Sequence, residues 1–342
     1  MKNNKILIIT ALSLEFNEVK QFLKNNKKEI HPTGIIYNSG TYESNNNIFE
    51  VLLVEAGPGN IRAADETSRS IEFFKPNYVF FVGIAGGIKD VSIGDVVAST
   101  KVIGFETGKA DTEFKPRFDS IPASYILEQT ARQVHRENIW VKKIDSDLSV
   151  TPLAFVQPIA AGEKVVSSNK SEVFGYLKNY CSDAVAIDME GIGFLIASRP
   201  HNVHSIEVRG ISDLIENKAK ADASGSQPKA ARNAAAFTFA MIDQLYESTS
   251  LTKDINTIQF QNNLVNILGK LYGQGPEQDN IWKRAGGDIS ILSNSSSRKS
   301  QWYDAIDKLV KGGGGEYITM ESLINQVNED YPNSDFINNL FN

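Results

Sequence analysis

Three carboxylate side chains stand just beyond apolar stretches of this sequence. Glu15, Glu190 and Asp213 each follow a short apolar, β-branched run, and Asp188 lies two residues before Glu190. In open α/β sheets, ligands bind at the carboxyl ends of strands, so acids placed there by separate strands can converge on one small polar molecule. The competing explanation is that each acid caps a helix, a common role for a single Asp or Glu after a strand. The pattern alone leaves the reaction open.

Glycines border the same stretches. Gly83, Gly86 and Gly87 lie in the segment VGIAGGIKDVSIGDVV, where they would let a ligand approach the backbone closely. The turn Gly57–Arg62 has the first half of a dinucleotide-binding fingerprint, but it lacks the third glycine and contains a proline. The sequence has no Walker-type phosphate loop. We therefore expect no dinucleotide and no other organic cofactor.

Metal ligands with suitable spacing are missing from the sequence. His201 and His204 lie near an expected turn without a well-spaced third ligand, so a capping or solvated role is favoured. Cys181 is the single cysteine, and without a neighbouring histidine or basic residue it is interpreted as a structural thiol. One cysteine excludes both a disulfide framework and a Cys-rich zinc site. We expect no bound metal.

Strand-like and helix-like segments alternate through the first 247 residues. The strand-like runs are apolar enough to be buried on both faces, so helices must cover the sheet. Strands are expected at Lys5–Thr10, Phe49–Glu55, Tyr78–Gly83, Val96–Thr100, Pro158–Val166, Ala184–Asp188 and Ser205–Ile211. Helices are expected at Leu14–Lys24, Asn60–Phe74, Tyr125–Asn138, Ser171–Tyr180, Glu190–Ser198 and Lys229–Tyr246. This order predicts a three-layer α/β domain over residues 1–248.

A small all-α domain is predicted over residues 258–342. The polar, Ser/Thr-rich stretch Glu247–Thr257 before it is interpreted as a linker. Apolar residues spaced three and four apart, as a single buried helix stripe requires, occur at Leu264, Ile267, Leu268 and Leu271. Four glycines, Gly312–Gly315, predict a loop. Helices are expected at Phe260–Leu271, Asp279–Ala285, Lys299–Val310 and Met320–Glu329.

The composition is that of an ordinary globular protein. The chain has 342 residues, of which 41% are hydrophobic, and 35 basic against 41 acidic residues give a net charge of −6. This balance argues against a protein that coats nucleic acid, whose phosphates attract basic surfaces. The apolar run near Met1 is too short for a signal-peptide core, and no stretch reaches the about 18 apolar residues of a membrane span. We expect a soluble, cytoplasmic protein.

Five motifs, in this order, resemble one known family. They are ALSLEF, GPGNIRAA, VGIAGGIKDVSIGDVV, AIDMEG and VRGISD, which lie within residues 5–247. Together they look like the nucleoside phosphorylase superfamily, and most closely like its methylthioadenosine/S-adenosylhomocysteine nucleosidase branch. The resemblance implies cleavage of the N-glycosidic bond of a purine nucleoside. It also implies a three-layer α/β fold with a central mixed, barrel-like sheet.

The resemblance assigns roles to individual residues. Glu15 matches the carboxylate that activates the attacking water, and Asp213 matches the aspartate that protonates N7 of the purine. Both roles suit an oxocarbenium-like transition state whose leaving base needs a proton. The other matches imply substrate contacts: Glu190 with ribose hydroxyls, Met189, Ala85 and Gly86 beside the sugar, Val166 with the base through its backbone, and Ser212 beside Asp213.

Three positions depart from the family. Where phosphate-using members carry an arginine and a serine, this sequence has Phe81 and Ile84, an apolar pair that cannot compensate the desolvation of a phosphate dianion. Hydrolysis is therefore expected rather than phosphorolysis, although Arg62 offers a different phosphate site. Val165 replaces the aromatic residue that stacks on the base. The substrate stays open among methylthioadenosine, S-adenosylhomocysteine, AMP and ATP.

A basic segment bears on the size of the substrate. Residues 104–119, GFETGKADTEFKPRFD, are longer and more basic than a pocket for an apolar methylthio group requires. Lys109, Lys115 and Arg117 are candidates to meet a phosphorylated 5′ end, as is Arg62 in the first turn of a helix, whose dipole favours anions there. The alternative is an ordinary solvated loop. Related nucleosidases fused to signalling modules occur in bacterial anti-phage systems, which makes an adenine nucleotide one hypothesis for the substrate.

Residues 258–340 resemble the small effector-associated domain of bacterial conflict systems. The resemblance rests on the Leu271-Tyr272 helix end, the Arg284-Ala285-Gly286 turn, Trp302 and a terminal Glu-Asp-Tyr-Pro. Such domains are similar to death-like adaptors, so a protein partner with a matching domain is implied. A helical cap on the catalytic domain or an oligomerisation arm is the alternative. The nucleosidases that the chain resembles are dimers, so a homodimer is expected.

Three functional interpretations follow. The expected one is an adenine nucleosidase that its C-terminal domain recruits to a partner. The alternatives are a phosphate-dependent purine nucleoside phosphorylase and a catalytically silent nucleotide sensor. Glu15, Glu190 and Asp213 together disfavour the sensor, because binding alone needs no water-activating base.

Overall fold

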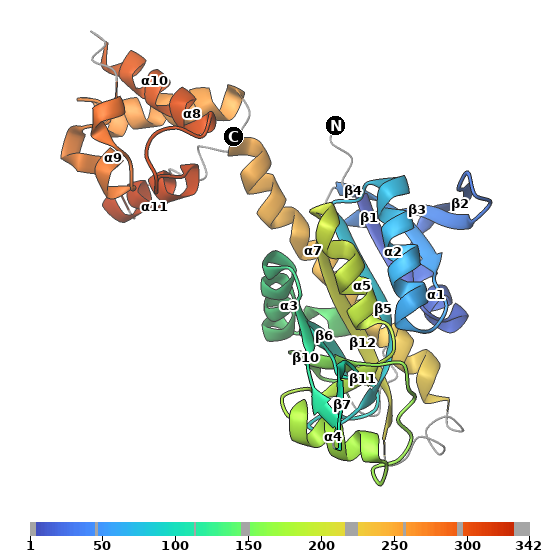
Figure 1. Cartoon of the computed structure of the whole chain (residues 1–342). Helices are drawn as coiled ribbons and strands as arrows, with labels where there is room; N and C mark the ends of the chain where they lie inside the picture. The colour runs from blue at the N-terminus through green and yellow to red at the C-terminus, as the bar shows by residue number, and fades with distance from the viewer. Residues whose placement is uncertain are drawn as a thin grey trace. The chain divides into compact units, whose positions relative to one another are not determined.

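The chain forms two compact units, residues 1–246 and 247–342, each with its own hydrophobic core. This computed structural model describes residues 5–44, 47–112, 114–144, 151–215, 225–255, 258–292 and 297–331. Figure 1 shows the elements of both units along the chain.

A mixed sheet forms the centre of the first unit. Within the described residues it contains ten strands, in the order β11-β10-β6-β12-β5-β1-β4-β3-β2 with β9 beside β6. β11 also pairs with β5, so β5, β12, β6, β10 and β11 close into a ring. The strands are β1 Lys5–Thr10, β2 Lys24–Ile30, β3 Ile36–Ser44, β4 Asn47–Glu55, β5 Tyr78–Gly87, β6 Val96–Gly104, β9 Asp119–Pro122, β10 Ala154–Ala161, β11 Ala186–Asp188 and β12 His204–Leu214.

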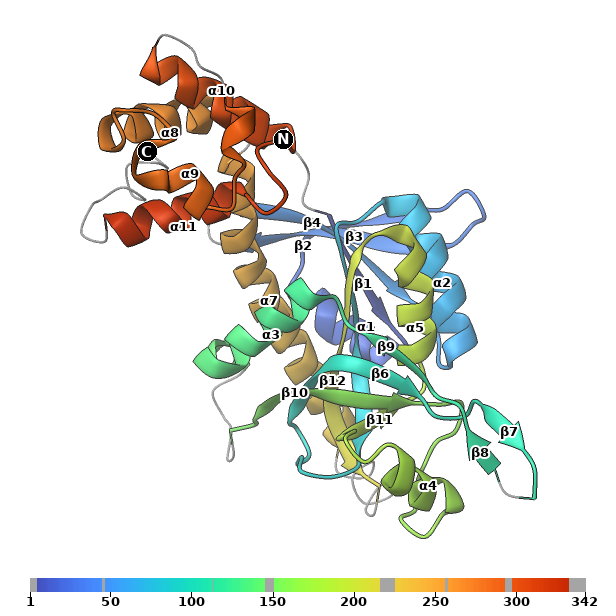
Figure 2. The same ribbon diagram turned by 60° about the vertical axis from the view of Figure 1, so that its left-hand side comes forward.

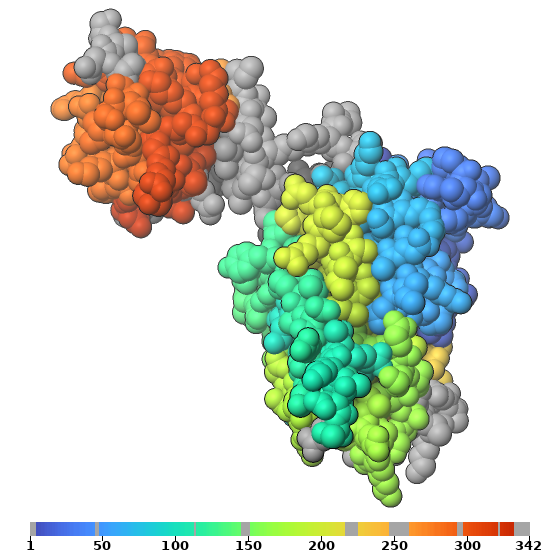
Figure 3. Space-filling view, in the orientation of Figure 1, coloured from blue at the N-terminus to red at the C-terminus, as the bar shows by residue number. Residues whose placement is uncertain are grey.

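Helices cover both faces of this sheet because its strands bury apolar residues on both sides. In β1, Ile6 and Ile8 join the core shared with α7, while Leu7 and Ile9 join the core shared with α2 and α5. Figure 3 shows α2 (blue) and α5 (yellow) side by side. The helices of the unit are α1 Ser13–Lys20, α2 Asn60–Phe74, α3 Tyr125–Glu137, η1 Ile139–Lys143, α4 Glu172–Tyr180, α5 Gly191–Ser198, η2 Arg199–His201 and α7 Ser226–Ile255.

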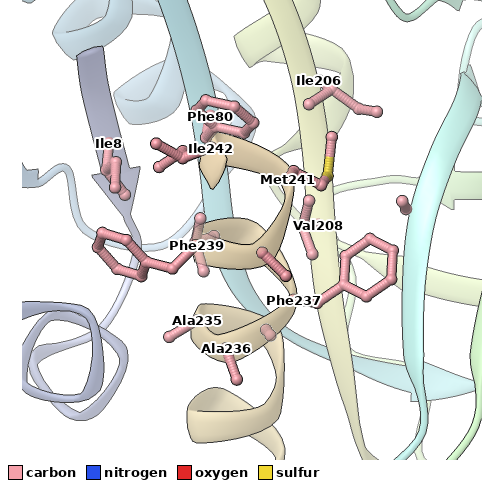
Figure 4. Packing of buried hydrophobic residues seen from close by; sticks show 14 of the residues in the cluster. Ile8, Phe80, Ile206, Val208, Ala235, Ala236, Phe237, Phe239, Met241 and Ile242 are labelled. Atoms are coloured by element: carbon pink, nitrogen blue, oxygen red, sulfur yellow. The ribbon is translucent and has the colours of Figure 1, made fainter. Parts of the chain in front are cut away.

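The largest core cluster lies between α7 and the sheet. Alanines on α7 let its backbone come close to the strands, and its aromatic residues fill the space between them. Figure 4 shows these α7 side chains meeting residues of β1, β5 and β12: Phe237, Phe239, Met241 and Ile242 against Ile8, Phe80, Ile206 and Val208.

The predicted fold class is confirmed, with local corrections. The helix expected over Leu14–Lys24 ends at Lys20, and Lys24 begins the antiparallel β2–β3 hairpin, which the sequence analysis did not predict. The strand expected at Pro158–Val166 is instead β10, which ends at Ala161. Pairing with β6 sets these limits, because residues from Ala154 onward find partners along β6.

The basic segment predicted to meet a phosphate forms a small hairpin. β7 (Gly108–Ala110) pairs with β8 (Phe114–Pro116), and Figure 2 shows them beyond the end of β6. Lys109 and Lys115 lie directly opposite each other and both pair with Asp111, at 3.4 and 3.0 Å. Aromatic contact with α4 holds the hairpin, since the rings of Phe114 and Tyr176 are 5.4 Å apart.

The secondary structure of the second unit, within its described residues, consists of helices joined by loops. Its core contains Trp282, Trp302 and Tyr272, and Trp302 Nε1 donates a hydrogen bond to the Tyr272 carbonyl at 3.2 Å. Tyr272 also donates its hydroxyl to Asp330 at 2.5 Å, and Arg284 pairs with the same carboxylate. Its helices are α8 Ile258–Leu271, η3 Gln278–Asn280, α9 Ile281–Arg284, η4 Ile289–Ile291, α10 Arg298–Val310 and α11 Met320–Asp330.

The stretch predicted as a linker is largely helical. α7 continues from Ser226 to Ile255, and residues 256–257 lie outside the described residues. Without a glycine or proline between 247 and 255, nothing in the sequence ends the helix earlier. None of the helices in the described part of the chain has the length and apolar character to cross a membrane.

Candidate active site

One pocket of about 260 Å³ gathers eight of the residues predicted to act on substrate. It opens where the carboxyl ends of β1, β5, β11 and β12 meet, as expected for an α/β sheet. The eight are Glu15, Ala85, Gly86, Val166, Met189, Glu190, Ser212 and Asp213.

Glu15 is both a helix cap and a pocket residue. Its Oε2 accepts the backbone N–H groups of Ala11 and Leu12 at 2.8 and 2.9 Å, which closes the first turn of α1. Its Oε1 accepts the N–H of Ile84 at 2.8 Å. Burial raises the pKa of Glu15 to about 7, against the opposing charge of Arg209 and these N–H donors. A carboxyl group with this pKa can take a proton from water near neutral pH.

Glu190 stands at the start of α5 and contacts two other elements. Its Oε1 accepts the N–H of Gly59, before α2, at 2.9 Å, and its Oε2 accepts from Arg209 at 3.1 Å. Burial raises the pKa of Glu190, while the Arg209 charge lowers it. Next to Gly59, the N–H of Asn60 donates to Glu163 at 3.2 Å. Carboxylates of the chain itself therefore accept these two N–H groups at the N-terminus of α2.

A bulge in β12 turns two successive side chains into the pocket. Neighbouring residues of a regular strand point to opposite faces, but the register with β5 shifts between Ile211 and Asp213. Ser212 and Asp213 therefore both line the pocket. The Ser212 hydroxyl lies 2.8 Å from Asp213 Oδ2 and 3.3 Å from the Ala85 carbonyl.

Arg209, to which the sequence analysis gave no role, joins the acids behind the pocket. It is fully buried, its Nη2 binds Asp188 and Glu190, and its Nε donates to Glu207 Oε1 at 2.6 Å. The signal was present in the sequence: Glu207 and Arg209 alternate in an apolar strand, so they share a face and must be paired to be buried.

Phe81 packs against the Arg209 side chain, and Gly83 leaves space for it. The Arg209 guanidinium carbon lies 4.7 Å from the centre of the Phe81 ring, a cation–π distance. A Cβ on Gly83 would lie 2.4 Å from Arg209 Nη1 and 2.6 Å from Glu15 Oε1. The glycine thus admits two charged side chains of the protein, where the sequence suggested the approach of a ligand.

Asp188 caps a helix, which was the competing explanation for an acid placed after a strand. Its Oδ2 accepts the N–H groups of Glu190 and Gly191, at 3.1 and 2.8 Å, at the start of α5. This orients Glu190 toward the pocket.

The residues predicted to bind a 5′ phosphate lie outside the pocket lining. Arg62, Lys109 and Arg117 are exposed and do not line this pocket, so their role stays a prediction. Lys164, which the sequence analysis did not single out, lines the pocket and pairs with Glu106 at 2.5 Å.

The contacts of His201, His204 and Cys181 fit structural roles. His201 Nε2 lies 3.1 Å from the Ser68 hydroxyl, and the His204 ring stacks on Tyr78. Burial raises the pKa of the Cys181 thiol to about 11, so the reactive thiolate is disfavoured. Within the described residues, His, Cys, Asp and Glu side chains form no group of three that could hold a metal ion.

Comparison with known sequences identifies relatives of the first unit. The family described as the phosphorylase superfamily matches residues 5–245. A 5′-methylthioadenosine/S-adenosylhomocysteine nucleosidase of Desulfotalea psychrophila is 28% identical over 245 residues, which cover 71% of this chain and 99% of that protein. An aminodeoxyfutalosine nucleosidase of Helicobacter pylori is 25% identical over 242 residues, 70% of this chain and 99% of the relative.

Solved structures show the same fold. A 5′-methylthioadenosine/S-adenosylhomocysteine nucleosidase of Colwellia psychrerythraea, in complex with adenine, has a TM-score of 0.59 at 22% identity and covers 71% of this chain and 96% of its own. The corresponding Helicobacter pylori enzyme has a TM-score of 0.58 at 22% identity, with coverage of 71% and 100%.

Proposed function

This chain belongs to the phosphorylase superfamily, and from that premise we propose that it hydrolyses the N-glycosidic bond of an adenine nucleoside or nucleotide and releases adenine. The observation that carries the proposal is the convergence of Glu15, Glu190 and Asp213, all buried, on one pocket. Curated relatives with nucleosidase names support the same reaction type.

Asp213 is the proposed proton donor. Cleavage leaves the electron pair of the N-glycosidic bond on the purine, and protonation of N7 makes the purine a better leaving group. Ser212 contacts one oxygen of the Asp213 carboxyl group, which fixes the orientation of that group in the pocket. Val166 lines the same pocket and is proposed to contact the base through its backbone.

Glu15 and Glu190 are proposed to act on the sugar side. Glu15 takes a proton from the water that attacks the anomeric carbon, and a pKa of about 7 suits a base at neutral pH. Glu190 binds ribose hydroxyls and brings negative charge near the oxocarbenium-like sugar. Met189, Ala85 and Gly86 supply the surrounding wall.

Hydrolysis is favoured over phosphorolysis by the charges around the pocket. The guanidinium of Arg209 is already engaged by carboxylates, and Phe81 packs on it instead of presenting a charge. Ile84 brings an apolar side chain to the lining. Lys164 also lines the pocket, but it pairs with Glu106, so a phosphate dianion desolvated here would compete with that carboxylate for its charge.

The decisive experiment incubates the full-length protein with methylthioadenosine, S-adenosylhomocysteine, AMP and ATP. Chromatography then measures free adenine, and the sugar product is identified as ribose or ribose 1-phosphate, with and without phosphate. Hydrolysis predicts a phosphate-independent free sugar. A requirement for phosphate would support the phosphorylase alternative, and tight binding without turnover would support the sensor.

The substrate panel also tests the 5′ phosphate site. We propose that Arg62, Lys109 and Arg117 favour phosphorylated substrates through charge. Replacing all three with alanine should then lower kcat/KM for AMP and ATP but leave that for methylthioadenosine unchanged. Equal effects on all substrates would remove this role.

We further propose that residues 258–342 recruit a protein with a matching helical domain, in a cytoplasmic defence response, and that the enzyme is a homodimer. The support for recruitment is the sequence resemblance. Of the residues behind it, Tyr272 and Trp302 are buried in the core of the unit, and the exposed Arg284 pairs with Asp330, which also accepts the Tyr272 hydroxyl. Light scattering of the purified chain tests the dimer, and co-purification with a candidate partner tests recruitment.

A further inference from the structure

Glu207 is a buried acid that the proposed reaction does not use. It does not line the pocket, yet its side chain is fully buried on β12 beside Arg209. The charged groups facing this cluster come from four elements: Arg209 on β12, Asp188 on β11, Glu190 at the start of α5, and Glu15 on α1. With all acids ionised, four negative charges would surround a single positive one.

Two buried oxygen atoms in this cluster lack a donor. Glu207 Oε2 and Asp188 Oδ1 have no hydrogen-bond partner among the described residues. The other oxygen of each group binds the same edge of the guanidinium, Glu207 at Nε and Asp188 at Nη2. Ionised carboxylates only accept hydrogen bonds, so two of them side by side cannot satisfy each other.

A single proton shared by the Glu207 and Asp188 carboxyl groups would give both unpartnered oxygens a hydrogen bond. It turns one oxygen into a donor and leaves the other as its acceptor. Burial, followed by the charge and hydrogen bonding of Asp188, raises the pKa of Glu207 well above its usual range, while Arg209 opposes the shift. The backbone of Gly191 lies against the same oxygen, since a Cβ on Gly191 would lie 2.3 Å from Glu207 Oε2.

We propose that Glu207 is a positioning residue that works in its protonated form, sharing its proton with Asp188 and so holding Arg209 against Glu190. The shared proton reduces the Asp188–Glu207 pair to one negative charge, which Arg209 neutralises. Glu190 then keeps its own negative charge and its contact with Arg209 Nη2. This ionised Glu190 is the form that the proposed reaction needs beside the sugar.

The test compares two variants of the full-length protein. Glu207→Gln retains an oxygen for Arg209 Nε and adds an N–H donor toward Asp188, so it mimics the protonated acid. Glu207→Leu has a similar volume but leaves Nε unpaired. We expect Leu to lower kcat by about tenfold to a hundredfold, as for an unpaired buried charge, and Gln to restore it to within about threefold of the wild type. Equal losses in both variants would overturn the proposal, because they would mean that the anion is required.

Two readouts do not depend on turnover, so they separate this inference from the proposed function on which it rests. Infrared spectra at about pH 8, above the pKa of Glu15, should show a protonated carboxyl band that Glu207→Gln removes. The Glu207→Gln variant should also have a higher melting temperature than the wild type. The difference should widen as pH rises, because only the wild type must keep an acid protonated in order to fold. A missing band, or a Gln variant that melts lower, refutes the shared proton. Lack of adenine release by the wild type refutes only the proposed function.

Discussion

Individual acids of the site both stabilise local structure and are placed for the proposed reaction. Glu15 closes the first turn of α1 and also reaches Ile84 on β5, which fixes its carboxyl group before any substrate binds. Asp188 caps α5 and also binds Arg209. Because these acids are anchored by backbone N–H groups, little reorganisation is needed when charge develops on the sugar.

The pH dependence of turnover should report Glu15. A general base must be ionised, and the pKa of Glu15 is raised to about 7, so the acid side of the kcat/KM profile should rise with pH through about 7. Initial rates of adenine release over a pH series measure this. A rise centred near the ordinary carboxyl value would show that Glu15 is not the base. Glu15→Gln is a poor test, because both carboxylate oxygens of Glu15 accept backbone N–H groups. An amide NH2 in place of either oxygen would face another donor, Ala11 or Ile84.

Asp213→Asn should lower kcat by about 10²–10⁴-fold, the usual contribution of a general acid. The amide keeps the size of the side chain and its position beside Ser212, but it cannot give a proton to N7. Adenine release is measured by chromatography, with an unchanged melting temperature as the control for folding. Turnover close to that of the wild type would eliminate Asp213 as the donor.

Close approach between helices positions the sugar-binding side of the site. Gly193 on α5 lies against the first turn of α2, where its N–H donates to Asn60 Oδ1 at 2.9 Å. A Cβ there would lie 2.1 Å from the Asn60 carbonyl oxygen. The same turn supplies the Gly59 N–H that binds Glu190. The separation of the two helices therefore sets the place of that carboxylate.

Gly193→Ala should destabilise the first unit by about 1–3 kcal/mol and raise KM, because the extra methyl group pushes α5 away from α2. Gly175→Ala on α4 is the matched control. Nothing lies within 4 Å of its added Cβ, so it should be neutral or stabilising. Thermal melts and steady-state kinetics compare the two variants. A Gly193→Ala protein as stable and active as the control would contradict the close packing.

At the scale of the whole molecule, each unit has its own core. The described residues that line the pocket belong to the first unit. Deleting residues 258–342 should therefore leave the kcat/KM for a free nucleoside within about twofold of the full chain, a change of less than about 0.5 kcal/mol. A folded but inactive truncation would show that the second unit regulates catalysis.

Separate cores also predict separate unfolding. Trp302 is fully buried and bonded to Tyr272, so Trp302→Ala should destabilise the second unit by about 3–5 kcal/mol. Calorimetry should show one transition moving down while the transition of the first unit and the nucleosidase activity are unchanged. A joint shift of both transitions would contradict independent folding.

The sequence by itself determined the α/β class, most strands and helices, and the acids that reach the pocket. Period-two and period-3.6 patterns are local, and the carboxyl ends of parallel strands share one edge of a sheet, so Glu15, Glu190 and Asp213 were placed together without coordinates. The β2–β3 hairpin was missed because β2 is polar and largely exposed, and β3, although partly buried, has no clear alternation of apolar and polar residues.

Only the tertiary structure decided how the site is held. The Arg209 cluster joins β11, β12 and α5, and the bulge that turns Ser212 inward depends on pairing with β5. The role of Gly83 is likewise set by side chains from two other elements. Contacts between elements distant in sequence depend on how strands order and close into a ring, and local residue patterns do not encode that geometry.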